Sequence, residues 1–452
     1  MKDNLFSDFD SVSAKQWKQK IQFDLKGADY NETLVWKTNE DILVKPFYHS
    51  DDIDEIPEVS STKATQWKIC QSIFVADVKK SNLKAIDVIK RGTESILFIL
   101  PTEDIPINDL LKNIDLNETV IRLDPLFISE KFVKTIPNNS GIEINTDIIG
   151  NLAKSGNWYA NLKDDFQNFG NIVKITNSFS VETSLYQNAG ASIVQQLAYA
   201  LAHVNEYLNN FENSEIKPTS LKVTFIVSVG TNYFFEIAKL KALRKLWNSL
   251  ISEYKIDEDC MILAIPTKRN KTIYDYNTNM LRTTTECMSA ILGGTDTICN
   301  LPYDAIYHKN NEFGERIARN QLLIIKNESY FDKVDNPADG AYYIESLTNQ
   351  LAEKALDLFK NIEANGGFLK QLKEGTIQRK IKESANKEQQ LFDSGEEILL
   401  GTNKHPNNND KMKNELEIFP FVKTNQRKTL IEPIIEKRLA ENLEQKRLKN
   451  EK

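Results

Sequence analysis

The feature that most constrains the fold is an alternation of short apolar runs with longer stretches of helical spacing. Eight runs rich in β-branched and aliphatic residues have the length of strands: 69–75, 95–100, 119–123, 142–145, 172–176, 221–229, 260–265 and 296–300. Between them, 186–211 and 279–292 carry apolar residues at i, i+3 and i+4, which predicts amphipathic helices. Apolar strands that alternate with helices are typical of a parallel sheet covered by helices.

The number of strands favours a closed barrel over an open sheet. Eight strand–helix units over roughly 240 residues match the usual size of a (β/α)8 TIM barrel. A doubly wound open sheet is the alternative, and a GxGxxG turn after the first strand would favour it, but the sequence has none. We expect an α/β chain with a (β/α)8 barrel over 61–405, an extended N-terminal arm and linker at 1–60, and a loop and C-terminal helix at 406–452.

The segments on either side of the expected barrel are polar. Residues 17–27 are expected to be partly helical, and residues 32–48 are expected to form extended or hairpin pieces. An arm of this kind buries little surface by itself, so it is expected to pack on something else. The stretch 429–452 is rich in Glu and Lys, which predicts a charged helix with a solvated face.

Composition excludes several classes of protein. The net charge is −7, which makes a nucleic-acid partner unexpected. No run approaches the roughly 18 apolar residues needed to span a bilayer, and the acidic start is unlike a secretory signal. The four cysteines form no CxxC pair, which is typical of reduced thiols. The chain is therefore expected to be cytoplasmic, with no nucleic-acid or membrane partner.

The inventory of catalytic motifs is poor. The histidines, His49, His203, His308 and His405, form no HExxH, HxH or Cys/His cluster, so no metal site is predicted. GxSxG and GxxxxGK[ST] are absent. His203 lies in an apolar helical stretch, which favours a core or interface role over catalysis. Gly293-Gly294 follows a predicted helix and is interpreted as a helix cap rather than a phosphate cradle.

Three polar residues follow predicted strands. Asp124, Asn300 and Asp304 would lie at the C-terminal face of the barrel, where active sites of this fold are built. Helix capping or hydrogen bonding to neighbouring loops is an equally weighted interpretation of the same residues.

Five segments resemble motifs of the methylmalonyl-CoA mutase family, and they occur in that family's order. The segments are NMLRTTTECMSAILGGTD (279–296), RIARNQLLIIKNES (316–329), VDNPADGAYYIESLT (334–348), IEANGGFLKQLKEG (362–375) and DSGEEILLGTNK (393–404). The resemblance covers roughly residues 12–445 and implies a barrel related to enzymes that rearrange a CoA thioester with adenosylcobalamin radicals.

The positions that depart from the family pattern are the ones that would contact substrate. The family's R-P-W-T-I-R-Q-Y-A-G corresponds to TQWKICQSIF, and its GYHMQEAGA, whose histidine would donate to the thioester carbonyl, corresponds to TSLYQNAGA. In a third departure, TICNLPYDA stands where the family has SLHTNSFDE, so Cys299 takes the place of a histidine. The degenerate pocket positions are therefore Thr65, Lys68, Cys70, Ser72, Ser184, Leu185 and Cys299.

These departures imply a chain with no catalytic residues of its own. The resemblance is to the degenerate small chain of heterodimeric mutases, which would pack on and stabilise a catalytic large chain that interconverts (R)-methylmalonyl-CoA and succinyl-CoA. Adenosylcobalamin is expected on that partner and none on this chain, because the cobalt-ligating D-x-H-x-x-G motif does not occur before Lys452. The alternatives are a catalytic acyl-CoA mutase barrel served by a separate cobalamin chain, and an acyl-CoA-binding or assembly protein.

Overall fold

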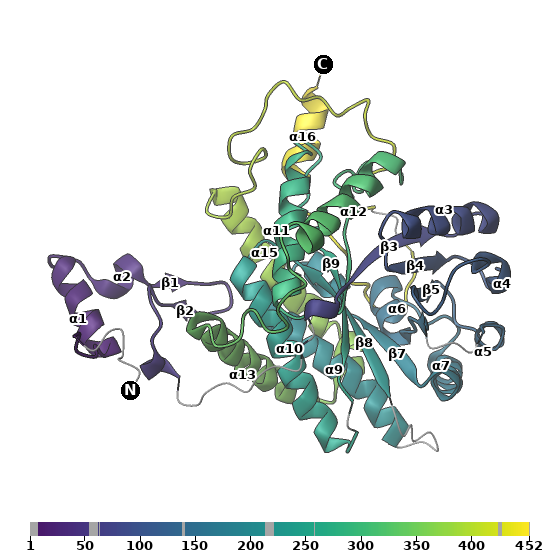
Figure 1. Cartoon of the computed structure of the whole chain (residues 1–452), viewed down its shortest axis with the longest axis horizontal. Coiled ribbons are helices and arrows are strands. Elements are labelled where there is room, and N and C mark those ends of the chain that lie inside the picture. Colours follow the sequence, from purple (N-terminus) through teal and green to yellow (C-terminus); the bar gives the residue numbers. More distant parts are fainter. Residues whose placement is uncertain are drawn as a thin grey trace.

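The structure is a computed structural model, and it describes residues 8–53, 62, 64–137, 141–212, 221–256, 258–423 and 427–451. Figure 1 shows a body of strands ringed by helices, with an arm that projects from one side. The predicted boundary near residue 60 lies outside the described residues, so the division into arm, barrel and C-terminal segment stays a prediction.

Eight parallel strands form the barrel, and this confirms the predicted fold class. They are β3 (Lys68–Phe74), β4 (Ser95–Leu100), β5 (Val120–Pro125), β6 (Ile142–Ile144), β7 (Ser178–Glu182), β8 (Lys222–Val229), β9 (Met261–Pro266) and β10 (Thr297–Cys299). Their order in the sheet is β6-β5-β4-β3-β10-β9-β8-β7. The two edge strands meet where the Ser180 amide donates to the Thr146 carbonyl at 3.2 Å, which nearly closes the barrel.

One predicted strand is wrong. Residues 172–176 form the last turns of α7 (Leu162–Thr176), and β7 begins two residues later. Phe169, Ile172 and Val173 lie at helical spacing and are buried, so the short apolar run is one face of a helix. Asn177 then ends the helix in the left-handed conformation, with φ at 50°.

Helices cover the barrel and continue after it. They are α3 (Val78–Lys90), α4 (Ile107–Leu110), α5 (Glu130–Val133), α6 (Ile148–Ser155), α7, α8 (Ser184–Asn188), α9 (Ile193–Glu212), α10 (Tyr233–Glu253), α11 (Thr278–Leu292), α12 (Glu312–Asn327), α13 (Tyr342–Ala364), α14 (Phe368–Lys373) and α15 (Thr376–Ser394). The predicted helix 279–292 is α11, and the predicted helix 186–211 is divided between α8 and α9.

The glycine pair after α11 has the capping role that the sequence predicts. Gly293 is the C-cap of the helix, and Gly294 has a φ of +83°. A Cβ atom on Gly294 would lie 2.3 Å from the side chain of Thr62, so any larger residue here would clash with Thr62 as well as strain the backbone.

The arm has the predicted helix and hairpin, and its helix is exposed whereas its hairpin is partly buried. It contains α1 (Ala14–Asp24), α2 (Tyr30–Leu34), the antiparallel pair β1 (Trp36–Lys37) and β2 (Leu43–Val44), and the short 3-10 helix η1 (Ser50–Asp52). All residues of α1 are exposed or half-buried, and Phe23 is 78% exposed. Ile42, at the hairpin tip, is only 1% exposed and belongs to the main core. The hairpin is thus seated in the barrel body, while α1 lies away from it (Figure 1).

The C-terminal segment differs from the expected charged helix. Residues 427–440, which we call the C-terminal strap, are not helical, and only α16 (Glu441–Asn450) is a helix. Pro433 lacks a backbone N–H and disfavours helix in the residue before it, which explains the break. The expectation of a solvated face is also wrong here, because Arg438 and Glu444 are 5% and 0% exposed and form an ion pair at 2.7 Å.

Candidate functional site

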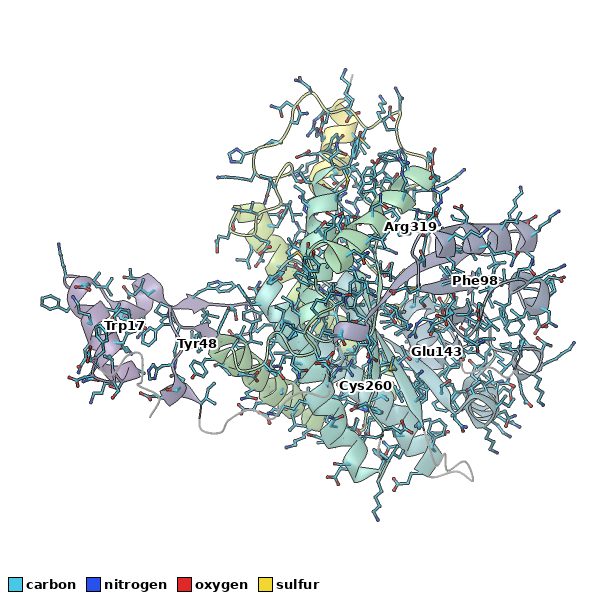
Figure 2. The ribbon with its side chains drawn as sticks, in the orientation of Figure 1. Trp17, Tyr48, Phe98, Glu143, Cys260 and Arg319 are labelled. Atoms are coloured by element: carbon cyan, nitrogen blue, oxygen red, sulfur yellow. The ribbon has the colours of Figure 1, made fainter. Side chains whose placement is uncertain are left out.

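The inner face of the barrel is apolar at its centre. Side chains from five strands, those of Cys70, Leu97, Ile226, Leu263 and Cys299, pack together there. Lower in the barrel, the guanidinium of Arg122 is paired with Glu143 at 2.5 Å and donates to the Thr297 hydroxyl at 3.3 Å. Figure 2 labels Glu143 within the ring of strands. The lumen is a packed core rather than a channel.

Three of the degenerate pocket positions come together inside the barrel. Cys70 and Cys299 lie opposite each other on neighbouring strands and pack in the same apolar cluster. Ser72 lies two residues after Cys70, on the same face of β3. Lys68 lies two residues before Cys70, on the same face of β3 and opposite Thr297.

The other degenerate positions lie elsewhere. Thr65 is in the 3-10 helix η2 (Ala64–Gln66), and its hydroxyl donates to the Asp335 carboxylate at 2.5 Å. Leu185 is 2% exposed and packs in the main core beside the mouth. Ser184, from the same turn of α8, donates through its backbone N–H and its hydroxyl to Glu182. The sequence-derived set is therefore divided between the lumen, the outer core and a surface loop.

A carboxylate cluster lies at the mouth, and sequence analysis identified only Asp124 of it. Asp147 accepts hydrogen bonds from His203 at 2.9 Å and Tyr207 at 2.5 Å, and also from the Gly150 and Glu182 amides at 2.7 Å each. His203 is fully buried and also contacts Tyr186, so the predicted core role of this histidine is confirmed.

Two of these carboxyl groups have raised pKa values. Burial raises the pKa of Glu182 to about 7, against the lowering effect of its hydrogen bond from Ser184. Burial also raises the pKa of Asp124 to about 6, while Lys154 opposes the shift and Asp147 adds to it. Both residues are half-buried. Because their pKa values are raised, the folded state holds a proton on these carboxyl groups more strongly than the unfolded chain does.

Glu182 and Asp124 should make the protein less stable as the pH rises. Their folded pKa values lie above the usual 4.5 and 3.8, so stability is full below about pH 4 and is lost as the pH rises through 6 and 7. At pH 8, Glu182→Gln should be more stable than the wild type by about 1–2 kcal/mol, and the difference should vanish near pH 5. Denaturant unfolding at several pH values measures this, with exposed Glu353→Gln as the control. If Glu182→Gln and the wild type differed in free energy of unfolding by the same amount at every pH, this prediction would be wrong.

The remaining predicted mouth residues have hydrogen-bonding roles. The Asn300 side chain donates to the Ala318 carbonyl at 2.9 Å and to Gln321 at 3.0 Å, which ties β10 to α12. Asp304 accepts from the Asn311 side chain at 2.7 Å. Of the two interpretations given to these residues, hydrogen bonding to neighbouring elements is the one observed.

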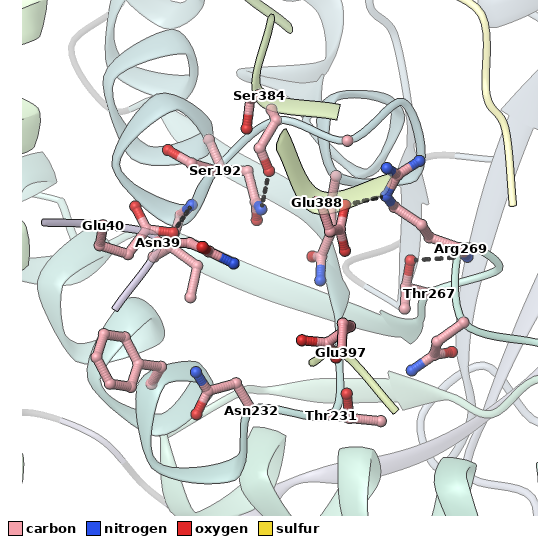
Figure 3. A pocket seen from close by; sticks show the side chains of 18 of the residues that line it. Asn39, Glu40, Ser192, Thr231, Asn232, Thr267, Arg269, Ser384, Glu388 and Glu397 are labelled. Carbon is pink, nitrogen blue, oxygen red and sulfur yellow. Dashed lines mark hydrogen bonds and ion pairs between the residues drawn. The ribbon is translucent and has the colours of Figure 1, made fainter. Parts of the chain in front are cut away.

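A polar cavity of about 200 Å³ lies beside the mouth, between the arm hairpin, the loops after β7–β9 and α15. Figure 3 shows Glu40 on one side of it and Arg269 with Glu388 on the other. Glu40 accepts from the backbone amides of Ile193 and Val194 at 2.7 and 2.9 Å, so a carboxylate from the arm caps the N-terminus of α9. Arg269 donates to Glu388 at 2.5 Å.

Glu236, which lines this cavity, belongs to a buried ion pair that sequence analysis missed. Lys239 lies 2.5 Å from Glu236, and its ammonium donates to Gln187, Gln196 and the Ser228 carbonyl at 3.0, 3.1 and 2.7 Å. The signal was available, because both charges lie one turn apart among the apolar residues of α10. These groups satisfy one another, so the cavity wall is a structural network.

The C-terminal strap runs along one side of the barrel rim. The Ile434 amide donates to the Ala153 carbonyl of α6 at 2.8 Å, and the Lys437 amide donates to the Asn188 carbonyl of α8 at 3.0 Å. The Leu439 amide then donates to the Arg269 carbonyl, beyond β9, at 2.9 Å. These acceptors follow β6, β7 and β9, so the strap joins the loops on one side of the face where this fold usually builds its active site.

Within the described part of the chain, no group of three or more His, Cys, Asp or Glu side chains is arranged to hold a metal ion. No helix among those residues combines the length and apolar character that crossing a bilayer requires.

Comparisons with known proteins found relatives that match most of the chain. The family model described as Methylmalonyl-CoA mutase matches residues 100–450. A methylmalonyl-CoA mutase small subunit from Porphyromonas gingivalis is 35% identical over 447 residues, which cover 90% of this chain and 72% of that protein. A methylmalonyl-CoA mutase from Rhizobium meliloti is 28% identical, and the match covers 89% of this chain and 65% of that one.

Among solved structures, a dihydropteroate synthase from Anaplasma phagocytophilum aligns with a TM-score of 0.33 at 10% identity, over 57% of this chain and 99% of that one. The mutase relatives are more similar in sequence, at 35% and 28% identity against 10%. The motifs, the barrel and the extent of the match agree, and the chain belongs to the methylmalonyl-CoA mutase family.

Proposed function

We propose that this chain is the small, non-catalytic subunit of a heterodimeric methylmalonyl-CoA mutase. It packs on the large chain and stabilises it, and the large chain interconverts (R)-methylmalonyl-CoA and succinyl-CoA by an adenosylcobalamin radical mechanism. The similarity to the Porphyromonas gingivalis small subunit supports this assignment. The match spans 65% of the Rhizobium meliloti mutase, so the activity of the whole enzyme comes to this chain only as a proposal.

The filled lumen of the barrel is the observation that carries the proposal. A thioester substrate needs space in the lumen and a donor for its carbonyl oxygen. Here Leu185, at the position of the family's carbonyl donor, has an apolar side chain that packs in the core. The centre of the lumen is filled by the thiols of Cys70 and Cys299 and their aliphatic neighbours.

The residues present do not fit a bound cobalamin. Of the four histidines, His203 is enclosed in the core and His308 is bonded to Asp304. His49 caps η1 in the arm, and His405 lies on an exposed loop. We therefore assign no step of the mutase reaction to this chain.

Reconstitution tests the proposed function. The purified chain should bind no adenosylcobalamin and show no mutase activity, and it should form a stable complex with the large chain in size-exclusion chromatography. The complex should carry the cobalamin absorbance and the activity. Stoichiometric cobalamin on this chain alone, or activity with only a small cobalamin-binding protein added, would instead identify a catalytic barrel.

The arm offers a sharper test of assembly. We expect residues 8–34 to contact the large chain, because Phe9, Trp17 and Phe23 are 76%, 49% and 78% exposed on a segment that buries almost nothing of its own. Removing residues 1–34 should weaken the complex at least tenfold and leave the barrel folded, as judged by titration and circular dichroism. The hairpin must be kept, because Ile42 is part of the core.

The matched control is Ile42→Ala, which should lower the stability of the isolated chain by about 2–4 kcal/mol through the cavity it leaves. It should change the affinity for the large chain much less than the truncation does. An unchanged dissociation constant after truncation would mean that α1 and α2 do not contact the partner.

A further inference from the structure

Two cysteines are paired in register across neighbouring strands inside the barrel. Cys70 on β3 lies opposite Cys299 on β10, and each side chain is 4% exposed. Both point into the lumen, where they contact the same aliphatic residues. Neighbouring strands lie about 4.8 Å apart, which falls within the range of about 4.4–6.8 Å between the Cα atoms of disulfide-bonded cysteines. The backbone therefore already has the spacing that a disulfide needs.

The surroundings favour a thiolate on one of the two sulfurs. The closeness of the two thiols lowers the pKa of Cys299 and raises that of Cys70. The Ser72 side chain also lowers the pKa of Cys299, and the positive charge of Arg122 lowers the pKa of both thiols. Arg122 is 1% exposed, and among the described residues its Nε has no hydrogen-bond partner. An unpaired donor of a buried guanidinium next to two thiols is a second feature that suits a negative sulfur.

A small reagent can reach the pair from the side of Cys70, which lies in register with Cys299. A cavity of about 90 Å³ is lined by Cys70 and Ser72 from β3, by Asn300 after β10 and by Arg319 of α12. Figure 2 labels Arg319 on the helix above the strands. This volume accommodates a molecule of a few heavy atoms, but not a bulky thiol reagent.

We propose that Cys70 and Cys299 are a redox-active thiol pair that hydrogen peroxide converts to an internal disulfide. The Cys299 thiolate attacks one peroxide oxygen, the O–O bond breaks, and the other oxygen takes a proton and leaves as water. The Cys70 sulfur then attacks the sulfenic sulfur of Cys299, the S–O bond breaks, and a second water leaves with the Cys70 proton. Two thiols lose two electrons, and one peroxide becomes two waters.

The other two cysteines provide an internal contrast. Cys260 and Cys287 are 1% and 0% exposed and lie in the main core. Burial raises the pKa of Cys260 to about 12 and raises the pKa of Cys287 as well, so both remain thiols. They should be inert to peroxide as long as the protein is folded.

The test is peroxide treatment of the full chain followed by alkylation under denaturing conditions and mass spectrometry. The four free thiols should fall to two, with a peptide in which Cys70 is joined to Cys299. The intact mass should fall by about 2 Da, and dithiothreitol should reverse the change. In Cys70→Ser, dimedone added with the denaturant after peroxide treatment should label Cys299 as a sulfenic acid. In Cys299→Ser, oxidation of Cys70 should be at least tenfold slower.

The matched control is Cys260→Ser, which should form the disulfide at the wild-type rate. Circular dichroism of each treated sample shows whether the chain is still folded. The proposal is overturned if all four cysteines oxidise together in the folded protein, if Cys70 and Cys299 stay reduced under peroxide, or if the only disulfides join separate molecules. None of these measurements requires the partner, so the outcome is independent of the proposed role in a mutase.

Discussion

Replacing the carbonyl-binding histidine of the large chain should remove nearly all activity from the reconstituted heterodimer, whereas Leu185→His or Ser72→Tyr in this chain should leave it near normal. Loss of one donor to a developing oxyanion costs on the order of 10²–10³ in rate. A histidine introduced at Leu185 would enter a core position that is 2% exposed, away from the lumen. It would therefore add no catalysis.

The measurement is a paired mutase assay on one preparation, with each barrel changed in turn and the cobalamin content determined. If disabling the large chain leaves more than a few per cent of the rate, this barrel is catalytic and the proposed function is wrong. If Ser72→Tyr in this chain reduces the mutase rate of the heterodimer, a change in the lumen of this chain alters the active site of the large chain.

The second large effect is on stability. Glu286→Ala should lower the free energy of unfolding by about 3–5 kcal/mol, because it leaves the ammonium of Lys271 buried without its counter-ion. Lys271 and Glu286 are 1% and 0% exposed, and they lie 2.7 Å apart. The carboxylate also accepts from Asn270 at 2.7 Å. Burial lowers the pKa of Lys271, and Glu286 opposes that shift, so the pair depends on both members.

Two further variants distinguish the effect of breaking this buried ion pair from the effect of removing a charge as such. Glu383→Ala breaks an exposed pair with Lys380 and should change stability by less than about 1 kcal/mol. The double change Lys271→Met with Glu286→Leu should recover most of the loss, since neither charge then remains. A loss below 1 kcal/mol for Glu286→Ala, measured by urea unfolding, would show that water reaches Lys271.

The strand–helix alternation was sufficient to predict the barrel, because it depends on local periodicity. The same criterion failed at 172–176, where an apolar run of strand length is the end of α7. Five residues are too few to separate a buried helical face from a strand, and the true strand β7, SFSVE, alternates serine with apolar residues. Its serines face the lumen, so β7 lacked the continuous apolar pattern that identified the other strands.

The site was predictable only where a motif was available. Cys70, Ser72 and Cys299 were identified by their positions in family motifs, and the structure brings them together. The Glu236–Lys239 pair was missed although its two charges lie one turn apart on an apolar helix. The C-terminal strap was missed because its bonds join residues far apart in the chain, and no local pattern encodes such contacts.

The route of the C-terminal strap affects how the chain matures. A polypeptide is synthesised from its N-terminus, so residues 427–440 leave the ribosome after every strand that they cross. Until then the Ala153, Asn188 and Arg269 carbonyls must bond to water, and the places later filled by Ile431 and Ile434 stay wet. The loops after β6, β7 and β9 therefore gain their last link to one another only when synthesis of the chain is nearly finished.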